Sequence, residues 1–159
     1  MNSIMQNYWP LFEMYQAMRG QMLGLLSDDE LLFSPGGANR PLGELFREIG
    51  ETERAYIDSF KEFACSFSFR NSDPGLAQSV ERLGAWHAEL DRELKAVVEG
   101  LTEEQVQSQR VHRGPNFEPP LQIQLSIYQE ALLIFYGKAS VYLKALNKPM
   151  PEQVRDWIA

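Results

Sequence analysis

The chain has 159 residues, 44% of them apolar and 23% charged, which is typical of a soluble globular protein and argues against global disorder. A domain of this length buries enough surface to fold without disulfides, so we expect a single domain over residues 1–159. The formal net charge is −7, and such a field repels phosphate backbones and anionic lipids, so it disfavours nucleic acid and membrane surfaces as partners.

The first half of the chain predicts two long helices. In residues 5–26, apolar side chains recur at steps of three and four, the spacing of one helix face. A capping-box pattern at 27–30 predicts a short further turn of helix, and the Pro/Gly-rich segment 34–39 breaks regular structure. Pro41 suits a first helical position, so the second helix is expected from Pro41 to about Phe63.

The second half predicts two more long helices. In residues 76–100, side chains of one helix face recur at alternating steps of four and three residues, which predicts the third helix. Asp73 is its expected N-cap, and Gly100 is expected to end it. Residues 102–111 predict one helical turn, and 113–120 a loop. The last long helix is expected over 120–146. It is apolar nearly all round at 131–136, so we expect it to be the central helix or to be buried against a second subunit.

These segments together predict an all-α protein, a four-helix bundle with a long connection before the last long helix. No strand pattern competes. Trp157 and Ile158 are expected to pack as an apolar tail. Cys65 is the single cysteine, the N-terminal segment lacks the pattern of a secretory signal, and the longest apolar run is far too short to span a membrane. We therefore expect a cytoplasmic location.

Most familiar catalytic motifs are missing from the sequence. There is no phosphate-binding glycine loop, no Gly-x-Ser-x-Gly and no His-Glu-x-x-His. His87 lies on an apolar helix stripe and is expected to be a core histidine with one hydrogen bond, ahead of a ligand or proton-transfer role. His112 is expected in solvent, and Cys65 as a small buried apolar residue rather than a reactive thiol.

Two segments resemble the DinB-like (DinB/YfiT) family of bacterial four-helix bundles. Residues 41–57, PLGELFREIGETERAYI, resemble the family's second helix, in which a metal-binding histidine is followed by a glutamate five residues on. Residues 136–146, YGKASVYLKAL, resemble the end of its fourth helix. Helix order and chain length agree over the whole chain. The resemblance implies a divalent metal held by three histidines, and metal-dependent transfer reactions with small thiols.

The sequence departs from the family at those three ligand positions. They fall on Glu48, Ala131 and Phe135; a slip of one residue to Arg47 places the first ligand nearly opposite the apolar stripe of its helix. Alanine and phenylalanine have no lone pair to give, and one carboxylate alone does not hold zinc against water. We therefore expect the family's metal centre to be lost, no cofactor to be bound, and a buried Glu48 to pair with Lys138.

Three interpretations follow from this departure. The first is a small-molecule-binding or structural, stress-related protein without enzymatic activity, a homodimer with exposed apolar candidates such as Trp86 and Trp157. Its expected pocket for a small apolar ligand is lined by Tyr15, Glu48, Tyr128, Ala131, Phe135, Lys138 and Tyr142, unless these residues are simple core packing. The second is a metal-dependent thiol transferase or hydrolase-like enzyme with altered ligands, such as Glu48 with His87 and a carboxylate. The third is a partner-binding helical module unrelated to the family.

Overall fold

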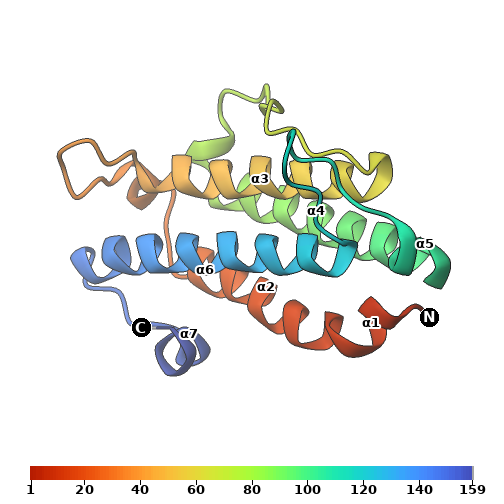
Figure 1. Cartoon of the computed structure of the whole chain (residues 1–159). Helices are drawn as coiled ribbons and strands as arrows, with labels where there is room; N and C mark the ends of the chain where they lie inside the picture. Colours follow the sequence, from red (N-terminus) through yellow and green to blue (C-terminus); the bar gives the residue numbers. More distant parts are fainter. Residues whose placement is uncertain (159) are drawn as a thin grey trace.

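The computed structural model describes residues 1–158, and its regular structure is helical (Figure 1). In this part of the chain there is no β-strand, only the isolated bridges Ala64–His112 and Arg110–Pro120. The all-α prediction is confirmed. The elements in chain order are α1 (Ser3–Asn7), α2 (Trp9–Leu23), the 3₁₀ turn η1 (Asp29–Leu32), α3 (Leu42–Glu62), the 3₁₀ turn η2 (Leu76–Gln78), α4 (Val80–Gly100), α5 (Glu103–Ser108), α6 (Leu121–Ala145) and α7 (Glu152–Trp157).

The four long helices α2, α3, α4 and α6 pack around one apolar core. Helix α3 packs against α4 on one side and α6 on the other, and α2 contacts the same two helices and closes the ring (Figure 1). Along α3 the buried apolar side chains recur at three- and four-residue steps, which is why this stretch folds as an amphipathic helix. No helix within residues 1–158 has the length and apolar character needed to cross a bilayer.

The first predicted helix is in fact two helices. Helix α1 ends at Asn7 and α2 begins at Trp9, with Tyr8 between them. Pro10 explains the break, because a residue without a backbone N–H fits only in the first turn of a helix. Asn2 caps α1 and donates through its amide nitrogen to the carbonyl of Val98 at 2.8 Å, so the N-terminus is held against the end of α4.

Two other helix starts differ from the sequence prediction. Pro41 is the N-cap of α3 rather than its first residue. Asp73 does not cap α4: its carboxylate accepts the N–H of Gly75 at 3.0 Å in a turn before η2. Ser79 caps α4 instead, because its extended backbone lets its hydroxyl accept the N–H of Arg82.

Helix α6 is not the central helix of the bundle. Leu132 and Tyr136 are fully buried, but Ile134 is 61% exposed and Val141 is 57% exposed. An outer face of α6 is therefore open in the single chain. A second subunit over this face stays a prediction.

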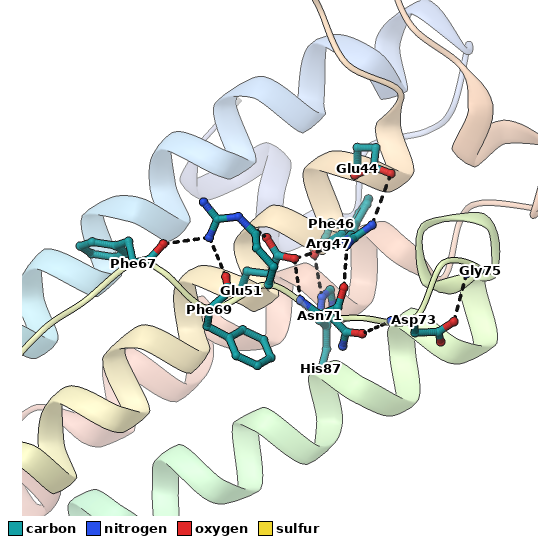
Figure 2. Close-up of polar contacts among 11 residues, drawn as sticks. Glu44, Phe46, Arg47, Glu51, Phe67, Phe69, Asn71, Asp73, Gly75 and His87 are labelled. Atoms are coloured by element: carbon teal, nitrogen blue, oxygen red, sulfur yellow. Dashed lines mark hydrogen bonds and ion pairs between the residues drawn. The ribbon is translucent and has the colours of Figure 1, made fainter.

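The loop between α3 and η2 is fastened along α3 (Figure 2). Arg47 donates to the Asn71 carbonyl at 2.6 Å and to the Glu51 carboxylate at 3.2 Å. Glu51 also accepts the N–H of Asn71 at 2.9 Å. Arg70, in the same loop, donates to the carbonyls of Phe67 and Phe69. The bonds of Arg47 and Glu51 to Asn71 hold the loop beside α3, whereas those of Arg70 lie within the loop.

Candidate functional site

The three positions that the family resemblance assigns to metal ligands meet at one surface hollow between α3 and α6. We call it the α3/α6 hollow; it has a volume of about 180 Å³. Glu48 enters it from α3, and Ala131 and Phe135 enter it from α6, one helical turn apart. The full lining is Leu45, Glu48, Ile49, Thr52, Ala131, Ile134, Phe135 and Lys138.

The residues of the α3/α6 hollow do not fit a metal ion. Phe135 is 5% exposed, and its ring packs edge-on against that of Phe46 with centroids 5.1 Å apart. Ala131 offers only a methyl group, which leaves Glu48 as the one donor among the three positions. Zinc and similar ions need three or four protein ligands. Among residues 1–158, no three His, Cys, Asp or Glu side chains lie together in a way that could hold a metal ion.

A second hollow of about 420 Å³ adjoins the first and shares Leu45, Glu48 and Lys138 with it. We call it the loop hollow, because the segment 35–40 forms its other wall. The Tyr142 hydroxyl donates to the carbonyl of Arg40 at 2.7 Å and fixes this segment to α6. The full lining is Pro35, Ala38, Asn39, Arg40, Leu45, Glu48, Lys138, Val141 and Tyr142.

The expected ion pair between Glu48 and Lys138 is not formed. Both side chains are exposed, and no salt bridge joins them. The prediction assumed that Glu48 is buried and needs a counter-charge. Glu48 instead lines both hollows with its side chain exposed, so its charge needs no protein partner.

Five of the seven residues expected in the pocket line these hollows, and two lie elsewhere. Tyr15 on α2 is half-buried, and its ring packs edge-on against Trp157 at 5.1 Å between centroids. Tyr128 is wholly buried and stacks on Tyr56 at 4.7 Å. Helical periodicity indicated that these rings face inward, but not which neighbouring helix each one meets.

A buried ionic network lies inside the bundle, and the sequence reasoning missed it. Arg19 on α2 is 1% exposed and donates to Glu53 on α3 at 2.5 Å and to Asp91 on α4 at 2.6 Å. Gln16 donates to the second oxygen of Glu53 at 2.7 Å. A signal for Glu53 was present, since it lies four residues from both Ile49 and Ile57 on the apolar stripe of α3. It also matches the family glutamate five residues after the first ligand position.

Asp91 is the outer end of this network, and its side chain is 37% exposed. Burial raises the pKa of Asp91 to about 7, and the neighbouring Glu53 carboxylate adds to the rise against the opposing effect of Arg19. The guanidinium therefore faces two carboxyl groups, one of which gains a proton near neutral pH.

His87 is a core histidine, as predicted. It is 4% exposed, and its Nε2 donates to the Phe46 carbonyl at 2.9 Å (Figure 2). Burial lowers the pKa of His87 well below its usual value, with a further contribution from Arg19, so the ring is neutral. Its Nδ1 is buried with no hydrogen-bond partner within the described chain.

The remaining candidates take structural or surface roles. Cys65 is half-buried rather than buried, and burial raises the pKa of its thiol, which disfavours the reactive thiolate. His112 is exposed, as predicted, and lies 2.9 Å from the Glu118 carboxylate. Trp86 is half-buried and covers Gly50, whereas Trp157 is 41% exposed.

Comparisons with known proteins agree with this fold. Residues 12–130 match the sequence profile of the DinB superfamily. The structure is similar to the crystal structure of a DinB-like protein, YjoA from Bacillus subtilis, with a TM-score of 0.70 over 88% of this chain and 92% of that chain. The two sequences are 17% identical, so this likeness concerns the fold alone. No curated protein matches the sequence. The segment that matches the DinB superfamily covers most of this chain, and the chain therefore belongs to that superfamily.

Proposed function

We propose that this member of the DinB superfamily lacks the metal centre that the family resemblance implies and acts as a binding protein. Its site is the α3/α6 hollow together with the adjoining loop hollow, and its ligand is a small molecule with an apolar body. The observation that carries the proposal is the placement of Ala131 and Phe135. In the lining of the hollow, a methyl group and a phenyl ring stand at two positions where the family resemblance implies nitrogen donors.

The size and lining of the site support this proposal. Small-molecule sites are concave and mostly apolar, with a few polar groups, and typically enclose roughly 300–1,000 Å³. The loop hollow, of about 420 Å³, falls in this range, and the α3/α6 hollow extends it toward Phe135. Leu45 lines both hollows, while Glu48 and Lys138 are polar groups at their shared boundary.

The alternative is a metal-dependent enzyme that uses Glu48, His87 and another carboxylate. The structure gives this ligand set no support. The Nε2 of His87 is engaged by the Phe46 carbonyl inside the bundle, whereas Glu48 lies exposed on the outer side of α3. Protein purified without chelators and without a metal-affinity tag separates the two hypotheses, because stoichiometric metal in elemental analysis would favour the enzyme.

The test of the proposed site restores the missing donors. We expect a variant with Glu48→His, Ala131→His and Phe135→His to bind one divalent ion per chain, because the three positions line a single hollow. Isothermal titration with zinc and with nickel measures the gain over the natural protein. The matched control places three histidines at exposed positions outside the hollow, by Glu62→His, Glu99→His and Lys144→His.

Two results would contradict this proposal. Stoichiometric zinc binding by the natural chain, lost on Glu48→Gln, would restore a metal centre. Equal metal affinity of the two triple-histidine variants would show that the three positions do not form a common site.

We further propose that the chain forms a homodimer. The support is a stripe of exposed apolar side chains at Tyr8, Leu11 and Met14, which are 40%, 51% and 49% exposed and recur at three-residue steps. Trp157 lies at the edge of this stripe, because its ring packs on Tyr15. Clusters of this kind on a soluble chain mark contact surfaces.

A further inference from the structure

The loop hollow is lined by two cationic side chains that form no ion pair in the described chain, either with Glu48 in the same lining or with any other carboxylate. Arg40 and Lys138 both line it, both are exposed, and neither forms a salt bridge or a side-chain hydrogen bond within residues 1–158. Nine of the 15 Lys and Arg residues do form ion pairs, including Arg47 and Arg70 on neighbouring segments. The chain has a net charge of −7, so carboxylates outnumber cations, and yet both cations of this hollow lack an ion pair.

The position of Arg40 is set by the fold rather than by chance. Its carbonyl accepts the Tyr142 hydroxyl at 2.7 Å, so its backbone is attached to the same helix that carries Lys138. Arg40 also lines a third hollow of about 310 Å³, which it shares with Glu48. Arg40 therefore lines two of the three adjoining hollows, which share residues and continue from one another to Phe135.

The apolar part of the surface lies directly beside these charges. Leu45, Val141 and Tyr142 line the loop hollow together with Arg40 and Lys138, and Leu45 continues into the α3/α6 hollow. A ligand with an anionic head and an apolar body satisfies both halves of this surface. A guanidinium binds a carboxylate or phosphate through paired N–H donors, and an ammonium adds a point charge.

We infer that the ligand of this site is a small organic anion whose carboxylate or phosphate head binds Arg40 and Lys138, while its apolar body lies over Leu45 toward Ala131 and Phe135. This inference rests on the proposed function and adds the charge of the ligand to it. Glu48 lines all three hollows, including the one that takes the head group, so it disfavours a ligand that carries more than one negative charge.

The experiment compares ligands that share one eight-carbon body and differ in the head group. Octanoate, octyl phosphate, octan-1-ol and octylammonium are titrated calorimetrically into the full chain, and octanedioate tests the second charge. We expect octanoate or octyl phosphate to bind at least tenfold more tightly than octylammonium, and octanedioate to bind more weakly than octanoate. The preference between carboxylate and phosphate identifies the head group, and either preference supports the inference.

Matched variants locate the binding. Arg40→Gln and Lys138→Gln should each weaken octanoate or octyl phosphate binding about fivefold, as expected for the loss of one solvent-exposed charge contact. Arg92→Gln and Lys144→Gln remove exposed cations that line neither hollow and should leave affinity unchanged. Ala131→Trp, or the smaller Ala131→Leu, fills the α3/α6 hollow and should weaken every ligand.

The outcomes separate this inference from the proposed function. Equal affinity for octanol and octanoate that is sensitive to Ala131→Leu but not to Arg40→Gln would overturn the anionic ligand and keep the binding site. Tighter binding of octylammonium would also overturn it. No binding of any of these ligands at millimolar concentration would overturn both.

Discussion

At the scale of single residues, the dominant feature is the charge buried at Arg19. Moving a guanidinium out of water costs several kcal/mol, and its pairing with Glu53 and Asp91 offsets this cost. Removal of Glu53, the fully buried partner, leaves the Arg19 charge without its buried counter-ion, which typically costs about 3–5 kcal/mol. The network therefore makes these positions far less tolerant of substitution than charged residues on the surface.

The raised pKa of Asp91 makes stability depend on pH. Its pKa is about 7 in the folded chain against an ordinary value of 3.8, so the folded state holds more protons than the unfolded state in this interval. The contribution of this group is fully present below pH 4 and is lost as the pH rises through 7. Because the side chain is 37% exposed, solvent screening reduces the effect, and we expect a loss of about 1–2 kcal/mol.

The substitution Asp91→Asn tests this assignment, because the amide keeps the shape but does not titrate. Urea unfolding at pH 5, 6, 7 and 8 should give a flatter dependence of the free energy of unfolding on pH than in the natural chain. Asp29→Asn, at an exposed position outside the network, is the control and should leave the slope unchanged. If the free energy of unfolding of Asp91→Asn depended on pH as steeply as that of the natural chain, the pH dependence would have to come from another group.

At the scale of elements, the contact between α3 and η2 depends on one glycine. A Cβ at Gly43 would overlap the carbonyl oxygen of Ala77 and also press on Leu31. Because the nearest obstacle is backbone rather than a mobile side chain, the two elements would have to separate.

We therefore expect Gly43→Ala to lower the free energy of unfolding by about 2–4 kcal/mol, measured by urea denaturation. Gly20→Ala is the matched control, since Gly20 also lies inside a helix and its Cβ would meet nothing within 4 Å. That control should raise stability by roughly 0.5–1 kcal/mol, because alanine favours the helix. Similar losses in both variants would rule out the overlap as the cause.

Apolar periodicity was enough to predict the four long helices, because steps of three and four residues leave one inward face at each. It did not locate the ends governed by local bonding. Asp73 and Ser79 are both residue types that cap helices, and either could have been the N-cap of α4. In the structure the Asp73 carboxylate accepts the N–H of Gly75 in a separate turn, and Ser79 is the N-cap. Pro10 was the local signal for the break before α2. The apolar periodicity runs through this break without interruption, so periodicity alone predicts one helix instead of two.

For the candidate site, the family resemblance placed Glu48, Ala131 and Phe135, and the structure brings these three positions to one hollow. The side-chain environment was less predictable. The exposure of Glu48 depends on how α3 packs against its neighbouring helices. The residues near Glu48 in the sequence do not determine that packing. Arg19 was missed for a similar reason: a lone charged residue in a helix is usually solvated, and its burial depends on two carboxylates from other helices.

At the scale of the whole molecule, the proposed homodimer can be tested through the stripe at Tyr8, Leu11 and Met14. Sedimentation equilibrium should show a dimer for the natural chain, and Leu11→Glu with Met14→Glu should shift it to monomer, because two charges in an apolar contact remain unpaired. Leu32→Glu, 61% exposed in the natural chain and in η1, away from both this stripe and the open face of α6, serves as the control and should remain dimeric. A natural chain that is monomeric at about 100 µM would contradict the proposal.

The network at Arg19 draws a partner from every long helix: Glu53 from α3, Asp91 from α4, and the hydroxyl of Tyr128 from α6 at 3.5 Å. If any one of the four helices is missing, a charged or polar group of this network is left in the apolar interior without its partner. We therefore expect the bundle to assemble in a single cooperative step, and truncated pieces of this polypeptide not to fold on their own.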